Sequence, residues 1–413
     1  MAEGSLVRPP LHGRLCDAAD ALAAALAVSL PWSTSATSIL IVLWLIALIP
    51  TLDVAAVRRE VTSAAGGLPV LFWALGALGM LWADVSWSER LAGLSGFHKL
   101  LVLPLLLAQF RRSGRAHWAL LGFLIATVVL LAVSWVLALT PGLTWRGPAT
   151  PGVPVKDYIL QSTIFAACAF ALLGLLPELR RARRRLVLAL GLVVAFLANI
   201  LYVATARTTL VVMAVLLPLL GLRQFGWKGV LAAMLIGGVL VGAAWEASPY
   251  LRTRVTTAFD EARAPSDGNV SSSVGLRFEY WKKSVAFIEE APVIGHGTGT
   301  IAMLFRRDVA FGANFWLLTD NPHNQLLATM LQLGLVGAAA LIAMWIAHLA
   351  LFCDRSLMAW LGLIVVIENV VGSFFNSSLF DFSHGWFYVI GVGVAGGNML
   401  HAAAPASALR SKT

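Results

Sequence analysis

Residues 186–222 read LVLALGLVVAFLANILYVATARTTLVVMAVLLPLLGL, and Arg207 is the one charged side chain among them. A helix needs about 20 apolar residues to cross the roughly 30 Å hydrocarbon core of a membrane. This stretch is almost twice that long, so a single tilted helix cannot accommodate it. We therefore expect two membrane-spanning helices that are joined by a tight turn at Ala204–Thr209.

The rest of the chain has the same apolar character. Hydrophobic residues make up 59% of the sequence and charged residues 12%, against about 25% charged residues in an ordinary soluble domain. Because the apolar runs have the length of spanning helices, we predict an all-α polytopic membrane protein that forms one integral membrane domain over residues 1–413. The twelve expected spans cover about residues 17–34, 37–57, 67–86, 92–110, 116–140, 157–177, 186–204, 207–222, 228–247, 323–350, 356–376 and 380–400.

Basic side chains concentrate on one alternating set of loops and tails, near residues 8–14, 58–59, 111–115, 180–185, 223–228, 355 and 410–412. Positively charged loops stay in the cytoplasm. We therefore expect both termini in the cytoplasm, and residues 248–322, between the ninth and tenth spans, on the outside. This distribution accounts for the net charge of +9 without a nucleic-acid partner. Residues 14–30 have the alternative interpretation of a signal peptide, which would break the charge alternation.

The long external segment has helices of its own. Gly275–Glu290 places Phe278, Trp281, Val285 and Ile288 at helical spacing, which is typical of an amphipathic helix lying on a membrane surface. A loop rich in serine precedes this helix at Ser266–Ser273, and a second short helix is expected at about Thr300–Val309. An excursion of this length with its own helices predicts a helical cap over a membrane cavity.

The segment Asn321-Pro322-His323 ends this excursion. Asn321 is a favourable N-cap and Pro322 suits the first helical position, so we predict that the next spanning helix starts here. The positive end of a helix attracts anions and disfavours the protonated imidazole. His323 is therefore a candidate general base, with a purely structural helix-start residue as the alternative.

Two arginines are candidates for anion binding. Arg207 stands in the expected hairpin turn, and Arg277 starts the external helix. A guanidinium group binds phosphate through a bidentate fork of donors. The alternatives are that Arg207 reaches lipid phosphates at the membrane surface and that Arg277 is part of a solvated helix face.

An acidic residue, Glu368, interrupts an apolar span next to Asn369. An ionisable residue within a membrane span is by default a candidate functional residue, with a basic partner or a bound proton. Lys99 and Arg90 lie at external span ends, and either is a candidate partner of Glu368. We include Asn321, Lys99, Arg90 and Glu368 as secondary candidates for substrate binding.

The sequence carries no signature of a cofactor or metal ion. Gly295, Gly297 and Gly299 resemble a phosphate-binding loop, but no strand precedes them and no Lys-Ser/Thr pair follows, which favours a closely packed turn. Asp-x-Asp motifs and metal-ligand spacings of His, Cys and carboxylates are absent. We predict no cofactor and no metal; ligands gathered from distant segments remain the alternative. Cys16 and Cys353 lie at predicted cytoplasmic ends and Cys168 within a span, so no external disulfide is expected.

Three motifs together resemble the bacterial O-antigen ligase and polymerase superfamily, and in particular its O-antigen ligases. They are Ala206-Arg-Thr-Thr209, Gly275-Leu-Arg-Phe-Glu-Tyr-Trp281, and Gly295-His-Gly-Thr-Gly299 followed by Asn321-Pro-His-Asn-Gln325. In that family an Arg follows Ser or Ala in a turn that ends a span, a second Arg starts a periplasmic helix, and a His opens the next span. These roles fall on Arg207, Arg277 and His323. The resemblance covers about residues 185–350, and Ala206 stands where Ser is common.

The resemblance implies a membrane-embedded, GT-C-like glycosyltransferase of the bacterial inner membrane with a periplasmic active site. The donor would be O-antigen polysaccharide on undecaprenyl diphosphate, and the acceptor a sugar hydroxyl of lipid A-core. The product would be lipopolysaccharide, formed with inversion and without a metal. Arg207 and Arg277 would bind the diphosphate, and His323 would be the general base.

Three other functions remain as alternatives. An O-antigen polymerase or a protein O-oligosaccharyltransferase would use the same donor and the same residues. A lipid or polysaccharide transporter is more distant, because it would show more charges near the membrane midplane and more broken helices, and would not need the long external segment.

Overall fold

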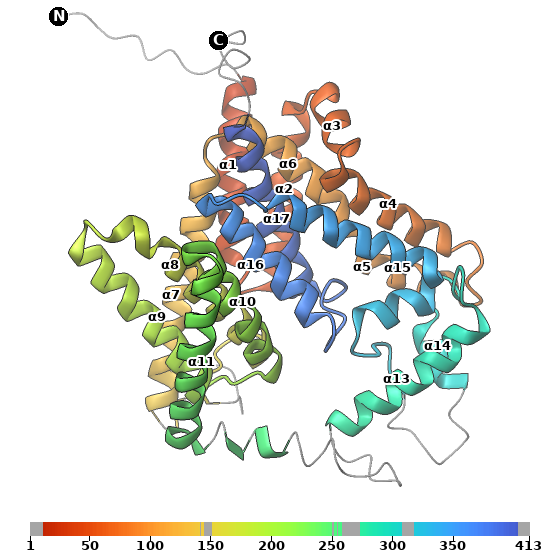
Figure 1. The fold of residues 1–413 in the computed structure, drawn as a ribbon. Coiled ribbons are helices and arrows are strands. Elements are labelled where there is room, and N and C mark those ends of the chain that lie inside the picture. Colours follow the sequence, from red (N-terminus) through yellow and green to blue (C-terminus); the bar gives the residue numbers. More distant parts are fainter. Residues whose placement is uncertain are drawn as a thin grey trace, which may run out of the picture.

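The structure is a computed structural model that describes residues 11–140, 142–143, 151–249, 252–253, 255–257, 273–307 and 318–403. All secondary-structure elements in these ranges are helices (Figure 1), so the predicted all-α class is confirmed. The first part contains α1 (Leu11–Ser29), α2 (Thr34–Leu48), η1 (Ile49–Thr51), α3 (Val54–Val61), α4 (Ala64–Gly79), α5 (Trp87–His98), η2 (Lys99–Leu101), α6 (Val102–Arg112) and α7 (Ala116–Leu139). The second part contains α8 (Tyr158–Leu179), α9 (Arg183–Tyr202), α10 (Arg207–Phe225), α11 (Trp227–Ala247), α13 (Ser273–Glu290), α14 (Ile301–Arg307), α15 (Gln325–Leu351), α16 (Leu357–Gly372) and α17 (Phe382–Ala402).

Eight helical spans in the described ranges are long and apolar enough to cross a membrane, or up to nine if α3 and α4, which meet at 80°, count as one. The chain is thus a polytopic membrane protein, but the predicted number of twelve spans is not confirmed. The eight do not include α1, α16 or α17. α16 has only 16 residues, and α1 carries Arg14, Asp17 and Asp20 within the helix.

The two helices predicted from residues 186–222 are present as α9 and α10, but they do not form a tight hairpin, because α9 packs along α8 and α10 along α11. In the short turn between them, the backbone N–H groups of Val203 and Ala204 donate to the carbonyl of Asn199 at 2.8 and 3.0 Å, and residues 204–206 are buried. Ser162 of α8 donates its hydroxyl to the carbonyl of Ala204, and Thr205 donates to Ile200 at 2.6 Å. The turn that leads into Arg207 is therefore fixed against α8.

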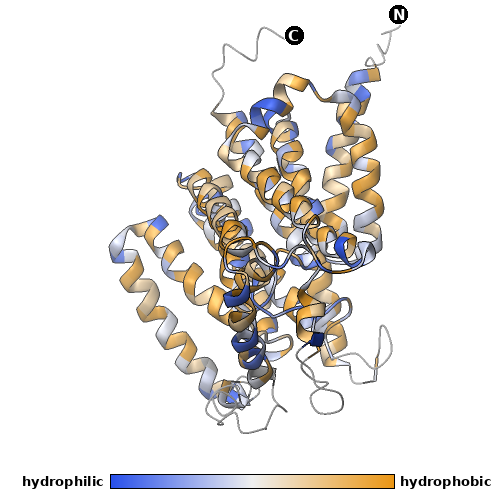
Figure 2. Ribbon diagram, turned by 90° about the vertical axis from the view of Figure 1, so that its right-hand side faces the viewer, coloured by the Kyte–Doolittle hydropathy of each residue, from blue (hydrophilic) through white to orange (hydrophobic). Residues whose placement is uncertain are grey.

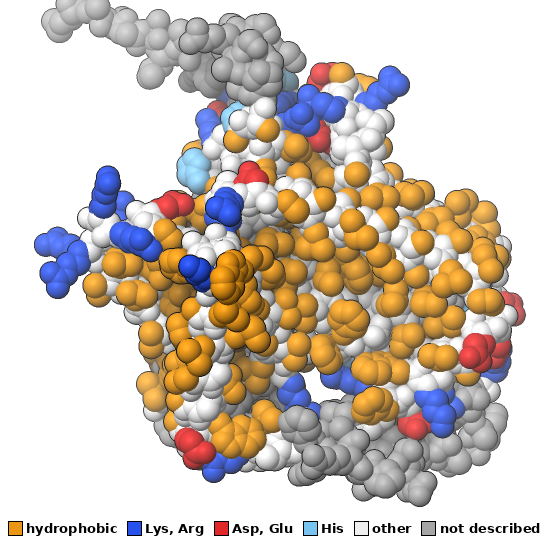
Figure 3. Space-filling model, viewed as in Figure 1, with side chains coloured by type: hydrophobic (Ala, Val, Ile, Leu, Met, Phe, Trp, Pro, Cys, Tyr) orange, Lys and Arg blue, Asp and Glu red, His pale blue; other side chains and the backbone are white. Residues whose placement is uncertain are grey.

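The helices pack in pairs, and in the described residues their buried apolar side chains form one large and two smaller clusters. α6 lies along α17, α8 along α9, α10 along α11, α4 along α15, and α1 along both α2 and α7. The apolar colour dominates the middle of most helices, and hydrophilic residues gather at their ends (Figure 2). The same pattern appears on the surface as a broad apolar area between charged edges (Figure 3). This is the distribution expected of helices that face lipid.

Contacts join loops that the sequence assigned to the same side of the membrane. On the predicted cytoplasmic side, the His401 ring lies 2.9 Å from the carbonyl of Arg111, and Arg223 donates to the carbonyl of Arg355 at 2.7 Å. On the opposite side, Arg306 of α14 pairs with Glu89 of α5 at 2.5 Å. The start of α1 and the end of α17 also lie at one edge of the molecule (Figure 1).

The two helices predicted in the external segment are present as α13 and α14, but the buried face of α13 differs from the predicted one. Of the predicted stripe, Ile288 is buried and Trp281 is half-buried, but Phe278 is 51% and Val285 48% exposed. Tyr280, Ser284 and Phe287 are also buried. The reason is tertiary: Tyr280 and Phe287 pack against Phe305 of α14 and against the start of α15, which shifts the buried face towards them. Of the predicted loop at Ser266–Ser273, residues 266–272 lie outside the described residues, and Ser273 is the first residue of α13.

α15 is interrupted at Gly334, which has φ +59°. The segment 292–297 supplies the backbone partners that the broken helix lacks. His296 and Gly297 donate to the carbonyls of Leu331 and Gln332, both at 2.9 Å, and the N–H groups of Leu335 and Val336 donate to the carbonyls of Pro292 and Val293 at 2.8 and 3.2 Å. A Cβ at Gly334 would stand 2.3 Å from Val293, and one at Gly295 would stand 2.5 Å from Gln332. The interpretation of Gly295–Gly299 as a closely packed turn is therefore confirmed.

Candidate active site

A cavity of about 80 Å³ brings together residues that lie far apart in the sequence. Arg277, His323 and Glu368 line it, so three of the predicted site residues meet there. The full lining consists of Ile159 and Thr163 from α8, Thr208 and Val212 from α10, Arg277 from α13, His323 before α15, Glu368, Asn369 and Gly372 from α16, Phe375, Asn376 and Ser378 from the following turn, and His384 and Phe387 from α17.

Arg207 is the first residue of α10 and directly precedes Thr208, which lines the cavity. Burial lowers the pKa of Arg277, and the positive charge of nearby Arg207 acts in the same direction. Two guanidinium groups that are close enough to interact in a half-buried site repel each other, and a bound anion relieves this repulsion. The pair therefore favours a ligand with more than one negative charge.

The backbone at His323 differs from the prediction. α15 begins at Gln325, and its N-cap is Asn324, whose side chain accepts from the N–H of Leu327 at 3.1 Å. The predicted cap, Asn321, uses its Oδ1 to accept from the N–H of His323 and from the hydroxyl of Ser377, both at 2.8 Å. The predicted helix start at Asn321 is therefore wrong. His323 lies outside the helix and has φ +54°, a conformation that is uncommon for a residue other than glycine.

A chain of hydrogen bonds fixes the tautomer of His323. Because Asn321 Oδ1 accepts from a backbone N–H, the other side-chain atom of Asn321 is its Nδ2, which donates to Oδ1 of Asn376 at 3.0 Å. The Nδ1 of His323 lies 3.1 Å from this same oxygen. An amide oxygen only accepts, so Nδ1 carries the hydrogen. The lone pair of the neutral ring is then on Nε2.

Helix α13 holds the segment that carries His323. The indole Nε1 of Trp281 donates to the carbonyl of Pro322 at 3.1 Å. The ring of Tyr280 is stacked on the His323 ring, with centroids 6.1 Å apart and an interplanar angle of 25°. Arg277 lies one helical turn before these two residues, so one helix positions both a cation and the imidazole.

The surroundings of His323 favour its neutral form. Burial, and after it the positive charge of Arg277, lower the pKa of His323 below the ordinary value of 6.5. The hydrogen bond to Asn376 and the charge of Asp320 oppose this shift. A histidine with a lowered pKa is unprotonated near neutral pH, which is the state that a general base needs.

Glu368 is 5% exposed and faces the cavity from α16. Within the described ranges neither of its carboxyl oxygens has a hydrogen-bond partner. The prediction that Lys99 or Arg90 pairs with it is wrong. Lys99 donates to the carbonyls of residues 379–381 at 2.6–3.1 Å, and Arg90 donates to the carbonyls of Met80 and Val85 at 2.8 and 2.9 Å. Lys99 thus anchors the turn that carries Asn376, and neither cation lines the cavity.

Sequence reasoning missed several residues of the site. Asn376 is the most important of them. The sequence feature that could have identified it is the polar run Asn376-Ser377-Ser378 between two apolar spans. His384 also lines the cavity, with its Nδ1 2.9 Å from Asp381. In the ranges that the structure describes, no three His, Cys, Asp or Glu side chains are grouped so that they could hold a metal ion.

Two comparisons with known proteins match parts of the chain. An uncharacterized protein of Haemophilus influenzae is 28% identical over 122 residues, an alignment that covers 27% of this chain and 30% of that relative. Residues 192–342, which include Arg207, Arg277 and His323, match the family model described as O-antigen ligase, so this part of the chain is similar to that family.

Proposed function

We propose that the protein is an O-antigen ligase that transfers O-antigen polysaccharide from undecaprenyl diphosphate to a sugar hydroxyl of lipid A-core. In this proposal residues 1–413 form one domain in the bacterial inner membrane, both termini are cytoplasmic, and residues 248–322 cover the cavity from the periplasm. The observation that carries the proposal is the cavity in which Arg277 faces His323, whose Nδ1–H is held by Asn376.

His323 acts as the general base. Its Nε2 takes the proton of the acceptor hydroxyl while the acceptor oxygen forms a bond to the anomeric carbon. The bond from that carbon to the diphosphate oxygen breaks, and the diphosphate leaves with the electron pair. Attack opposite the leaving group inverts the anomeric carbon. A positioned base contributes about 10²–10⁴-fold to the rate of such a transfer.

Arg207 and Arg277 bind the diphosphate and stabilise the charge that develops as it leaves. Because the interaction between the two guanidinium groups lowers the pKa of Arg277, an anion that contacts both is favoured over one that contacts neither. Two cations of this kind supply the neutralisation that a divalent metal supplies in other glycosyltransferases. We therefore expect transfer to proceed without a metal ion or cofactor.

Glu368 contacts sugar hydroxyls of a bound substrate, since its buried oxygens face the cavity and lack partners within the described ranges. Asn321 acts indirectly, because it fixes the backbone of His323 and orients Asn376. Lys99 and Arg90 hold backbone carbonyls and so support the site from outside it.

Deletion of the gene tests this function. We expect lipid A-core to lose its whole polymer while undecaprenyl-linked polymer accumulates, and the unchanged gene should restore the polymer whereas a His323→Ala gene should not. Lipid A-core that carries a single repeat would instead indicate a polymerase. Unchanged lipopolysaccharide would refute both functions.

A further inference from the structure

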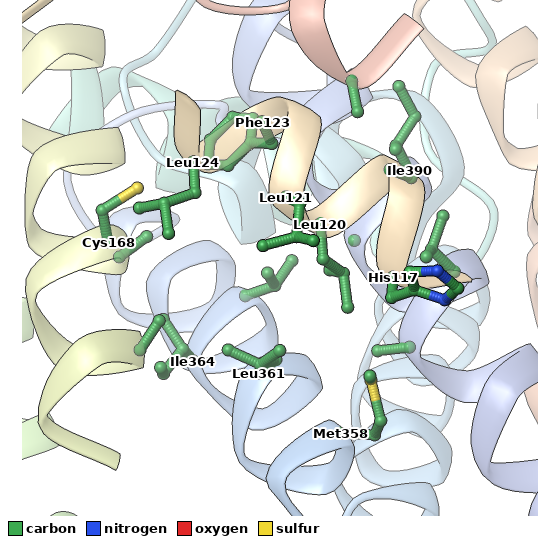
Figure 4. A pocket seen from close by; sticks show the side chains of 18 of the residues that line it. His117, Leu120, Leu121, Phe123, Leu124, Cys168, Met358, Leu361, Ile364 and Ile390 are labelled. Carbon is green, nitrogen blue, oxygen red and sulfur yellow. The ribbon is translucent and has the colours of Figure 1, made fainter. Parts of the chain in front are cut away.

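A second cavity, of about 370 Å³, lies between α1, α7, α8, α16 and α17, and its lining is almost entirely apolar. Figure 4 shows the apolar side chains of α7 facing those of α16 across it. The residues labelled there are His117, Leu120, Leu121, Phe123, Leu124, Cys168, Met358, Leu361, Ile364 and Ile390. We call this cavity the apolar groove.

The apolar groove continues the candidate active site along the same helices. Phe387 of α17 lines both. On α16, Ile364 lines the groove and Glu368, one turn further on, lines the site. On α8, Thr163 lines the site and Ala167, again one turn on, lines the groove. One helical turn rises about 5.4 Å, so the polar cavity and the apolar groove are adjacent layers of one structure.

We propose that the apolar groove holds the polyprenyl chain of the diphosphate donor. The inference rests on the proposed function and deepens it. A ligand with an anionic head and a long apolar tail matches a cationic cavity that continues into an apolar one, and 370 Å³ is within the range of about 300–1,000 Å³ that is typical of ligand sites. The layered arrangement places the head at Arg277 and the first part of the tail beside Phe387.

The groove acts by positioning the donor. Lipid tails in the bilayer are as apolar as the groove. Transfer of the polyprenyl chain from the bilayer into the groove therefore gains little free energy from the hydrophobic effect. Packing of the chain along the groove instead fixes the direction in which the anomeric carbon of the donor faces His323. Filling the groove should therefore impair a long-chain donor and leave a donor too short to reach it unaffected.

Leu361→Trp on α16 and Leu120→Trp on α7 fill the groove from opposite walls. The matched control is Ile125→Trp, on α7 but 63% exposed and not part of the lining. With purified protein, we expect both groove variants to lose about tenfold of kcat/KM for a saccharide on undecaprenyl diphosphate, the scale expected from overpacking a fitted site. The same saccharide on dimethylallyl diphosphate, whose five-carbon chain is too short to fill the groove, should be transferred as by the wild type. The control should match the wild type with both donors.

Equal losses with both donors, or no loss with either, would overturn the assignment. A KM for lipid A-core that rises equally with both donors would assign the groove to an acyl chain of the acceptor. That result would also overturn the assignment to the donor.

A binding measurement separates this inference from the proposed function. In a chain with Cys16, Cys168 and Cys353 replaced by alanine, Leu361→Cys is labelled with an apolar maleimide. Undecaprenyl diphosphate should slow labelling, whereas dimethylallyl diphosphate and a bilayer phospholipid should not. Protection by phospholipid alone would refute the inference. Protection by undecaprenyl diphosphate in a protein that transfers no saccharide would refute the proposed function and leave the groove assignment in place.

Discussion

The Nδ1 of His323 lies 3.1 Å from the Oδ1 of Asn376, an oxygen that also accepts from Asn321. The partner of the imidazole is thus a neutral amide and not a carboxylate. An amide orients the ring and selects its tautomer, but it stabilises the protonated imidazole less than a carboxylate would. This partner therefore allows burial and Arg277 to keep the pKa of His323 low.

The first prediction concerns pH. Transfer needs neutral His323, so kcat/KM should fall as the pH drops through the pKa of His323, with a midpoint below 6.5 in the wild type. Asn376→Asp adds a negative charge beside the ring, raises this pKa and should move the midpoint upward. Asn376→Ala releases the ring and should lower the maximal rate by about 10²-fold, the scale of a misplaced catalytic group. An acid limb that is identical in the wild type and in Asn376→Asp would contradict the role of Asn376.

The second prediction separates catalysis from binding. His323→Ala should reduce transfer by about 10²–10⁴-fold, because the acceptor proton has no base, and should leave donor binding nearly unchanged. Binding of undecaprenyl diphosphate and the rate of transfer are measured on the same preparation. The matched control is His98→Ala, since His98 is exposed and bonded to Trp73 away from the cavity. Near-normal transfer by folded His323→Ala protein would eliminate the general-base role.

The third prediction concerns the two arginines. Arg207→Ala or Arg277→Ala should each remove charge-assisted hydrogen bonds to the diphosphate, with a loss of about 1.5–3 kcal/mol in donor binding, and should also slow transfer. Arg→Lys should restore binding only in part, because an ammonium group cannot form the bidentate fork. Lys282→Ala, which removes an exposed cation from the same helix as Arg277, is the control. Donor affinity that drops equally in Lys282→Ala would indicate a general charge effect in place of a site.

The fourth prediction is that Glu368 lowers the stability of the protein but supports its activity. A buried carboxyl group without a hydrogen-bond partner costs about 1–3 kcal/mol, so Glu368→Leu should raise the thermal stability of the detergent-solubilised protein. If Glu368 contacts substrate, the same variant should lose transfer activity, and Glu368→Gln should retain more of it. A variant that is both more stable and fully active would show that Glu368 has no part in the reaction.

The fifth prediction concerns sidedness. In single-cysteine proteins, Lys282→Cys on α13 should react with a membrane-impermeant thiol reagent in intact spheroplasts, because the proposed topology places the external segment in the periplasm. Cys353 is exposed and lies at a predicted cytoplasmic end, so it should react only after lysis. The reverse pattern would invert the topology and place the cavity in the cytoplasm.

The features that follow from local pattern were predictable from the sequence. The two helices on either side of the turn before Arg207 follow from the length of one apolar run, although each packs against a different helix. α13 and α14 follow from helical spacing and flanking turn residues. The span count was less predictable, because short or polar helices such as α16 and α1 pack as parts of the bundle without meeting the length and hydropathy of an independent span.

The details of the site depend on partners that are distant in the sequence. Asn321 and Asn324 are equally suitable caps by local rules, and Ser377 and Asn376 decide between them by occupying Asn321. Likewise, contacts with Phe305 of α14 bury Tyr280 and Phe287 of α13, whereas Phe278 and Val285 of the predicted stripe stay exposed. The tautomer of His323 follows from Asn376, which no local pattern connects to it.

The break in α15 has a consequence for how substrates arrive. Residues 292–297 satisfy backbone groups on both sides of Gly334, and each such group left without a partner in an apolar environment would cost several kcal/mol. α13 ends at Glu290, directly before these residues, so the same hydrogen bonds tie the end of α13 to the middle of α15. A substrate that enters the cavity must therefore do so without separating α13, which carries Arg277, from α15.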